Sequence, residues 1–362
     1  MAVGFPLKTT YANGDVYSAG DVNDITGTIN LLQTSTLSSS AGKNIVIGGG
    51  LDIWQRGTSF AGVGSPLYTA DRWNLNAPSA QTFSRQTTSD TTNLPFIQYC
   101  ARIQRTNLSA NTTAVYVSSS YESVNCIPFA GKTVTLSFYA RVGANWAGTS
   151  FGIQLISGTG TDQNLNTGFT GSTNVISVSP TFTTTWQRFS YTGTVASTAT
   201  QLGFLMSWLP SGTAGANDYI EITGVQVELG SYATTFSRAG GTIQGELAAC
   251  QRYYYRYLGE STGTTFICNA WWFNANNAYG VVPFPVSMRT YPSAMDTSGT
   301  AANYGTYAGG SAITCSAVPI LDTPNRNNAL VQFVVSSGGV TGYGGAARIL
   351  NTSAYLGFTA EL

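Results

Sequence analysis

The stretch KTVTLSFYARV at residues 132–142 alternates strictly between apolar and polar side chains. Its apolar positions are Val134, Leu136, Phe138, Ala140 and Val142. Successive side chains of a β-strand point to opposite faces of a sheet, so this period of two predicts a strand with one buried face. A buried face needs a second layer to cover it. We therefore expect a sheet packed against another sheet.

Similar runs of strand-forming residues surround this stretch. They lie at residues 114–118, 151–156, 186–195, 201–208 and 219–228. Turns rich in Gly, Ser and Thr separate them, as at residues 157–161 and 211–215. Many short strands with little helical periodicity predict an all-β sandwich or jelly roll. Inside the last run the apolar phase slips at Gly224, which predicts a β-bulge there.

A second β-domain is predicted after a boundary near residues 238–242. Residues 246–252 fit one or two helical turns, and the aromatic run from Tyr253 to Tyr257 follows as a strand, expected to be buried between domains or subunits. Further strands are expected at residues 265–270, 280–284, 329–336 and 346–351. The predicted domains are therefore 44–238 and the smaller 239–362.

Residues 1–43 differ from the rest and are predicted to form an attachment segment with a short helix and a polar linker. Val22, Ile25, Ile29 and Leu32 follow each other at spacings of three and four, as in the apolar seam of a coiled coil. So short a helix is marginal alone. We expect the seam to associate with copies of itself as a trimer; the alternative is packing on its own chain.

The composition excludes several classes of function. The chain has 362 residues, with 16 basic and 16 acidic side chains, no His and only 9% charged residues, against about 25% in an ordinary domain. Without His there is no Ser-His-Asp relay, no histidine metal ligand and no histidine base. Zero net charge argues against nucleic-acid binding. No apolar run approaches the roughly 20 residues needed to cross a bilayer, and the start lacks the pattern of a secretion signal.

No cofactor or metal is expected either. The five cysteines lie far apart without a paired spacing, which predicts reduced, mostly buried thiols in a protein made in a cytosol. A zinc site is disfavoured because the usual spacing is missing. Asp15, Asp21 and Asp24 do not form the oxygen-rich loop of a calcium site.

Several strings resemble one family in their order along the chain. NIVIGGGLDIWQRGTSF at residues 44–60, YTADRW at 68–73 and GVQVELGSYATTF at 224–236 resemble a carbohydrate-binding-module-like jelly roll of bacteriophage tail-fibre and other virion-surface proteins. The later strings ELAACQRYY (246–254), FPVSMRTYPS (284–293) and AYLGFTAEL (354–362) are similar to the C-terminal domain of such fibres, and AGDVND (19–24) to their attachment ends.

The resemblance implies a homotrimeric fibre component on the virion surface, assembled in the cytoplasm of a host bacterium. Its N-terminal segment would dock to other phage tail or capsid proteins, and its distal β-domains would bind host cell-surface polysaccharide. Two alternatives stay open. One is a head or neck decoration fibre without a specific receptor, and the other is a polysaccharide depolymerase.

Sugar-binding surfaces combine exposed aromatic rings with amide and hydroxyl groups. Trp271, Trp272, Asn274 and Tyr279 form the richest such stretch. Neighbouring residues of a strand point to opposite faces, so only one of the two tryptophans can enter a given core. The alternative for this pair is a core or intersubunit role.

Further glycan contacts are expected from aromatic residues beside glycines, on predicted loops. These residues are Tyr304, Tyr307 and Tyr343. Loops often hold binding residues, although a solvated turn is the alternative reading.

No catalytic residues are predicted. Glycoside hydrolysis needs two carboxyl groups about 5 to 9 Å apart. The acidic residues are scattered, and Asp218 and Glu221, three apart on a strand, belong to opposite faces. Arg56, Asp71 and Arg72 lie between Trp54 and Trp73, where an ion pair beside packed indoles is the expected arrangement.

Overall fold

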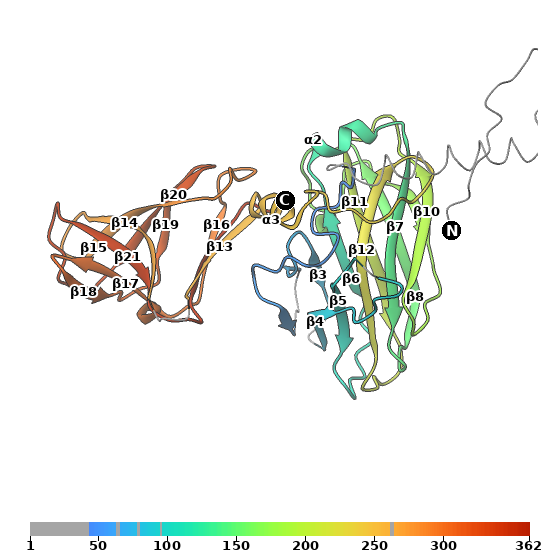
Figure 1. Cartoon of the computed structure of the whole chain (residues 1–362), viewed down its shortest axis with the longest axis horizontal. Helices are drawn as coiled ribbons and strands as arrows, with labels where there is room; N and C mark the ends of the chain where they lie inside the picture. Colours follow the sequence, from blue (N-terminus) through green and yellow to red (C-terminus); the bar gives the residue numbers. More distant parts are fainter. Residues whose placement is uncertain (1–42, 63–65, 78–79, 95, 261–263) are drawn as a thin grey trace, which may run out of the picture.

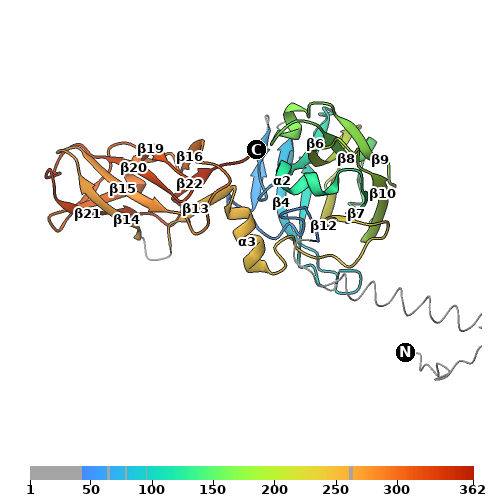
Figure 2. The same cartoon turned by 90° about the horizontal axis from the view of Figure 1, so that it is seen from above.

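Two β-sandwiches lie side by side with a short helix between them in the computed structural model (Figures 1 and 2). The structure describes residues 43–62, 66–77, 80–94, 96–260 and 264–362. The predicted seam of Val22, Ile25, Ile29 and Leu32 lies outside the described residues. The all-β class predicted from the sequence is confirmed.

The N-terminal sandwich consists of two six-stranded antiparallel sheets. One sheet has the order β1 (Ser59–Ala61), β4 (Gln81–Thr87), β5 (Tyr99–Arg105), β12 (Tyr219–Leu229), β7 (Thr133–Val142) and β10 (Gln187–Thr194). The other has the order β2 (Leu67–Tyr68), β3 (Asn74–Asn76), β6 (Val115–Ser120), β11 (Gln201–Pro210), β8 (Gly148–Gly158) and β9 (Thr173–Val178). Short helical turns connect them: α2 (Ser123–Cys126), η1 (Ile127–Phe129) and η2 (Leu165–Thr167).

The alternating stretch at residues 132–142 forms β7, as predicted. Its apolar face is buried in the core between the sheets, and Val134, Leu136 and Phe138 have no exposed surface. The Phe138 ring stacks on Phe189 of the neighbouring β10 at 5.4 Å. Burial of this face is the main stabilising contribution of the strand, at roughly 1.5 to 3 kcal/mol for each large side chain.

The predicted bulge at Gly224 is also confirmed. The register between β12 and β7 shifts between Thr223 and Gln226. Gly224 has φ +59°, a conformation that side chains with a Cβ rarely adopt. Glycine at this position therefore lets β12 bury Ile220 and Ile222 before the bulge and Val225 and Val227 after it.

The C-terminal sandwich packs a seven-stranded sheet against a three-stranded one. The larger sheet has the order β18 (Ser311–Thr314), β17 (Tyr304–Ala308), β21 (Gly344–Ile349), β14 (Thr265–Trp272), β15 (Asn277–Pro283), β20 (Asn328–Val334) and β19 (Ile320–Pro324). The smaller has the order β13 (Tyr254–Leu258), β22 (Tyr355–Thr359) and β16 (Ala294–Thr297), and η3 spans Ala301–Asn303. Their shared core includes Trp272, Phe333 and Phe358.

The helix between the sandwiches is α3 (Ile243–Gln251), close to the predicted turns at residues 246–252. The side chain of Thr242 caps its first turn by accepting a hydrogen bond from the Gly245 N–H. Glu246 in that turn is fully buried and accepts hydrogen bonds from the Gly48 and Gly240 N–H groups at 2.6 and 2.7 Å. These bonds attach the helix to the N-terminal sandwich.

A row of alternating tyrosine and arginine side chains runs between the two sandwiches. Arg56 lies 3.6 Å from the ring of Tyr254 and 5.5 Å from that of Tyr68. Arg256 lies 3.7 Å from the ring of Tyr355 and 5.4 Å from that of Tyr254. A guanidinium over an aromatic face is attracted by the ring, more strongly when both are shielded from water. We call these five side chains the arginine–tyrosine row.

Ion pairs beside this row join the same two parts of the chain. Glu361 pairs with Arg72 and, at 3.1 Å, with Arg56. Glu122 accepts hydrogen bonds from Arg252 at 3.0 Å and from the Tyr253 hydroxyl at 2.6 Å. Arg289 pairs with Asp162 at 3.2 Å. Tyr253 and Tyr254 are thus buried between domains, one of the two expectations for the aromatic run.

Asp71 is fully buried in this interface, and its surroundings shift its protonation. Burial raises the pKa of the Asp71 carboxyl to about 6, although Arg56 at 3.6 Å and the Gln55 N–H at 2.9 Å favour the charged form. The expected Arg56–Asp71 pair is therefore present. Arg72 instead pairs with Glu361, a partner that the local sequence did not predict.

We expect Glu361→Ala to loosen the contact between the sandwiches without unfolding either core. The variant leaves Arg72, which is 2% exposed, without a carboxylate, and breaking a buried pair in this way costs about 3 to 5 kcal/mol. Small-angle X-ray scattering should show a larger radius of gyration, and protease should cleave near residues 238–242. Glu260→Ala, at an exposed position, is the control. Unchanged scattering and cleavage would contradict the role of Glu361.

Asp71→Asn should change how stability depends on pH. A carboxyl with a higher pKa in the folded state binds its proton more tightly when folded, so its contribution grows as the pH falls through about 6 and is complete below the ordinary value of 3.8. Relative to Asp71→Asn, the wild-type chain should therefore gain up to about 3 kcal/mol between about pH 7 and pH 4. Urea unfolding at both pH values measures this; a pH-independent difference would refute it.

Candidate functional site

The outer face of the seven-stranded sheet presents a group of aromatic rings. Trp271 and Phe273 are 42% and 63% exposed, and both contact Tyr279 on the neighbouring β15. The Trp271 and Tyr279 rings stack at 6.1 Å with an angle of 26° between them. Farther along β14, Phe266 is 62% exposed and stacks on Tyr307 of β17 at 6.3 Å. We call these five residues the aromatic platform.

Strand alternation explains why the rings share one face. Ala270 and Trp272 of β14 point into the core, whereas Asn269 and Trp271 point outward. Trp271 is paired with Gly344 of β21, and a Cβ added at Gly344 would meet no atom within 4 Å. The indole is therefore open on the β21 side, while Tyr279 supports it on the other.

Amide groups lie beside the rings. Asn269 is exposed on β14, and Gln332 of β20 donates a hydrogen bond from Nε2 to Oδ1 of Asn277 at 2.9 Å. The backbone register places Gln332 next to Tyr279. A hollow of about 780 Å³ is lined by Phe266, Asn269, Trp271, Val281, Pro283 and Ala346. Apolar ring faces next to amides are the chemistry that an amphipathic sugar ring fits.

The structure divides the predicted glycan contacts into three groups. Trp272 and Tyr304 are 1% and 0% exposed, so these two predictions are wrong. Trp272 fills the core and donates from Nε1 to the Tyr307 carbonyl at 2.9 Å, and Tyr304 donates its hydroxyl to the Tyr355 carbonyl at 2.5 Å. The stretch around Tyr304 and Tyr307 is strand β17, not a loop, because it pairs with β18 and β21 on either side.

Asn274 has a local structural role. Its Oδ1 accepts hydrogen bonds from the N–H groups of Asn276 and Asn277, both at 2.9 Å, which closes the turn between β14 and β15. Trp271, Tyr279 and Tyr307 belong to the platform, and their contact with glycan stays a prediction. Tyr343 is 54% exposed, and its carbonyl accepts a hydrogen bond from the Trp272 N–H beside the platform.

Sequence reasoning missed several residues of this face, among them Phe266, Asn269, Phe273 and Gln332. The signal was present in TFICNAWWF at residues 265–273, where every second residue from Asn269 onward is an amide or aromatic side chain. The alternation of inward-facing and outward-facing side chains along β14 is interrupted near Ile267, because the register between β14 and β21 shifts between Phe266 and Cys268. This bulge placed Phe266 on the same face as Trp271, which the spacing alone did not indicate.

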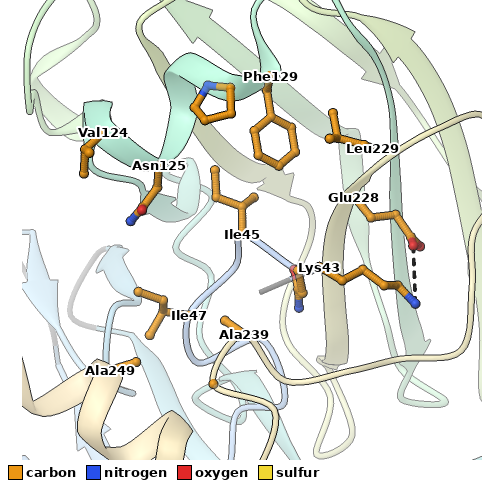
Figure 3. A pocket seen from close by; sticks show the side chains of 13 residues that line it. Lys43, Ile45, Ile47, Val124, Asn125, Phe129, Glu228, Leu229, Ala239 and Ala249 are labelled. Carbon is orange, nitrogen blue, oxygen red and sulfur yellow. Dashed lines mark ion pairs between the residues drawn. The ribbon is translucent and has the colours of Figure 1, made fainter. Parts of the chain in front are cut away.

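Figure 3 shows a different cavity, of about 590 Å³, between the N-terminal sandwich and α3. Ile45, Phe129 and Leu229 point into it, and Lys43 and Glu228 form an ion pair at 3.5 Å along one side. Glu228 also accepts hydrogen bonds from Thr234, so its oxygens are already occupied. The cavity offers mainly apolar contacts and few free polar groups, which does not suit a sugar.

A smaller hollow of about 410 Å³ lies beside the arginine–tyrosine row and includes Phe60, Leu67 and Asp296. Asp296 accepts hydrogen bonds from Arg256 at 2.9 Å and from the Tyr254 hydroxyl at 2.7 Å. Its charged groups are thus engaged with each other. We assign this hollow to the interface between the sandwiches.

The buried carboxylates of the N-terminal sandwich are paired with arginines. Asp218 pairs with Arg105 at 2.8 Å, and Glu221 pairs with Arg102 and Arg141 at 2.6 and 2.5 Å. The two carboxylates are held by separate arginines. Both carboxylates are thus engaged in ion pairs inside the N-terminal sandwich and are not free to flank a bound sugar, as the two carboxyl groups of a glycosidase must.

The described residues contain no group of three or more His, Cys, Asp or Glu residues placed to hold a metal ion. All five cysteines are free, and four of them are buried, as the sequence indicated. Burial raises the pKa of the Cys126 and Cys315 thiols to about 12, so they are unreactive. None of the described helices is long and apolar enough to span a membrane.

Comparison with protein-family models gives no match, and comparison with curated protein sequences gives none. Solved structures with a partial likeness include a xylan-binding CBM22 domain from Paenibacillus barcinonensis Xyn10C, with 12% identity and a TM-score of 0.30 over 54% of this chain and 99% of that one. TmCBM61 in complex with β-1,4-galactotriose has 12% identity and a TM-score of 0.31 over 52% of this chain and 99% of that one.

A third structure with a partial likeness is the enzymatically active domain of tailspike protein 4 from bacteriophage CBA120. It has 13% identity and a TM-score of 0.31, and the match covers 52% of this chain and 21% of the tailspike chain. Because all three TM-scores are close to 0.3, these likenesses do not identify a family or a ligand for this chain.

Proposed function

We propose that this chain binds glycan through the aromatic platform and serves as a fibre protein of a bacteriophage virion. The observation on which the binding role rests is the exposed stack of Trp271 on Tyr279, flanked by the amides of Asn269 and Gln332. An indole that is 42% exposed on a rigid strand offers a flat apolar surface without an entropic cost of ordering it.

Along most of this face, a neutral polar ligand fits better than a highly charged one. Strands β14, β15, β17, β18 and β20 contain no Asp, Glu, Lys or Arg. Hydrogen bonds to sugar hydroxyls would come from amides and from backbone groups at strand ends. Such contacts change little with ionic strength, because there is little charge to screen.

We propose binding without cleavage. Two carboxyl groups on either side of a bound sugar are needed for hydrolysis, and the platform strands β14, β15 and β17 supply none. The buried acids Glu122, Asp218 and Glu221 are engaged with arginines elsewhere. Release of reducing sugar from a bound polysaccharide would instead favour the depolymerase alternative.

The fibre role rests on the sequence resemblance described above, and so does the proposed placement on the virion surface. In that role the N-terminal segment docks to tail or capsid proteins and the platform faces the host. Weak binding per chain would be strengthened by the effective concentration of linked copies. A decoration fibre without a receptor is the alternative, and it predicts assembly onto particles without binding to cells or glycans.

Trp271→Ala should weaken glycan binding roughly tenfold, because one stacking contact is worth about 1 kcal/mol or more. The measurement is binding of the full chain to an array of bacterial capsular and lipopolysaccharide glycans. Tyr232→Ala is the matched control, since Tyr232 is 81% exposed but belongs to the N-terminal sandwich. If both variants bind glycan as well as the wild type, the site lies elsewhere. If the wild-type chain binds no glycan, the decoration fibre is favoured.

Gly344→Val tests the same face by adding a side chain next to Trp271 instead of removing one. A side chain here meets no protein atom within 4 Å at its Cβ, so the fold should tolerate it. It would cover the open side of Trp271 and block a sugar from stacking. We expect loss of glycan binding with a melting temperature within about 2 °C of the wild type. Full binding by a folded Gly344→Val chain would contradict stacking on this side.

The trimer is proposed from the seam at Val22, Ile25, Ile29 and Leu32, which the described residues do not include. Ile25→Asp places a charge in the seam and should abolish the oligomer, because a buried unpaired charge is strongly unfavourable. Light scattering measures the mass in solution. A trimer that persists in this variant would mean that other parts of the chain hold it together.

A further inference from the structure

Outside the edge strand β19, which contains the exposed Asp322, the seven-stranded sheet carries one charged residue. Arg348 of β21 is the single charged side chain in strands β14, β15, β17, β18, β20 and β21. It is only 5% exposed. Among the described residues Arg348 forms no ion pair with a carboxylate within 4 Å, and its Nε is buried without a hydrogen-bond partner.

This arrangement is unusual within the molecule. The described residues include three buried arginines, Arg72, Arg105 and Arg348. Arg72 pairs with Glu361 and Arg105 with Asp218, whereas Arg348 has only the Tyr307 ring at 3.8 Å and the Thr306 carbonyl at 3.5 Å. A buried charge without a counter-ion is strongly unfavourable, so the absence of a partner for Arg348 calls for an explanation.

The position of Arg348 connects it to the aromatic platform. It is paired in register with Phe266 on one side and Gly305 on the other, and its guanidinium lies over the ring of Tyr307. Phe266 and Ala346, the next outward-facing residue of β21, line the hollow beside Trp271. Arg348 lies four positions after Gly344 in β21, about 13 Å along the strand. The platform therefore has an apolar end at Trp271 and a cationic end at Arg348.

We infer that the Arg348 end of the platform binds the carboxylate of an acidic sugar residue, so that the glycan is a uronic-acid-type polysaccharide. This inference rests on the proposed function. A guanidinium presents paired N–H donors that match a carboxylate, and such charge-assisted bonds are strong where water is excluded. The neighbouring sugar units would lie over Phe266 and Trp271. The carboxylate of the bound sugar would supply the counter-ion that Arg348 lacks in the free protein.

Arg348→Met distinguishes a binding role from a structural one. Met has a similar length without the charge, and replacing an unpaired buried charge by an apolar side chain should leave stability unchanged or raise it. We expect binding of acidic polysaccharide to fall about tenfold or more, with an unchanged or higher melting temperature. Arg326→Met, at an exposed position of the same sandwich, is the control.

The ligand is tested with matched probes. Each acidic polysaccharide of the array is compared with its carboxyl-reduced form, in which the uronic acid becomes a neutral sugar. Free glucuronate is compared with glucose in thermal melts at equal ionic strength. We expect wild type to prefer the native polymer and to be stabilised by glucuronate, and Arg348→Met to show neither effect.

Different results would overturn the acidic-sugar inference and the proposed glycan site. Equal binding of native and reduced polymers that still depends on Trp271 would overturn the acidic-sugar inference and leave glycan binding intact. Binding that is insensitive to both Trp271→Ala and Gly344→Val would overturn the proposed site itself. Stabilisation by inorganic phosphate as large as that by glucuronate, lost in Arg348→Met, would overturn the assignment to a carboxylate and point to a phosphate-bearing glycan.

Discussion

Arginine–carboxylate pairing across the two sandwiches is the interaction on which the arrangement of this molecule depends. Each sandwich has its own apolar core and would bury its residues without the other. Their mutual placement rests on Glu361 between Arg56 and Arg72, on Glu122 with Arg252 and Tyr253, and on the arginine–tyrosine row. A chain with only 9% charged residues thus concentrates charge where two domains meet. Buried pairs of this kind contribute little net stability, but they penalise every other arrangement that leaves a charge unpaired.

Local features of the fold could be predicted from the sequence, whereas the long-range arginine–carboxylate pairs could not. Alternation over residues 132–142 and the phase slip at Gly224 are local signals, and both led to the correct strand and bulge. The opposite directions of Trp271 and Trp272 follow from strand geometry alone. Glu361 lies 289 residues from Arg72, and no local pattern indicates such a pair. Glycines around Tyr304 suggested a loop, yet pairing with β18 and β21 makes it a strand and turns the ring into the core.

The aromatic platform illustrates a second limit of sequence reasoning. Residue type predicted correctly that this stretch is rich in rings and amides, but exposure decides which of them can touch a ligand. Trp272 and Tyr304 are as aromatic as Trp271 and Tyr307, and only the register of β14 and β17 against their neighbours separates the two groups. Arg348 could not have been singled out in advance, because its lack of a counter-ion becomes visible only when the surrounding strands are assembled.

The contact between the sandwiches also has a mechanical meaning. If the platform holds a surface while the N-terminal segment is held by a particle, tension passes through the molecule from one sandwich to the other. The covalent connection near residues 238–242 is a single strand of chain, whereas the ion pairs and the arginine–tyrosine row bridge the gap at several points in parallel. Residues from both ends of the C-terminal sandwich, Tyr254 and Glu361, grip the same arginine, Arg56. The force is therefore shared among several contacts that must be lost together, so the interface between the sandwiches resists a short-lived force.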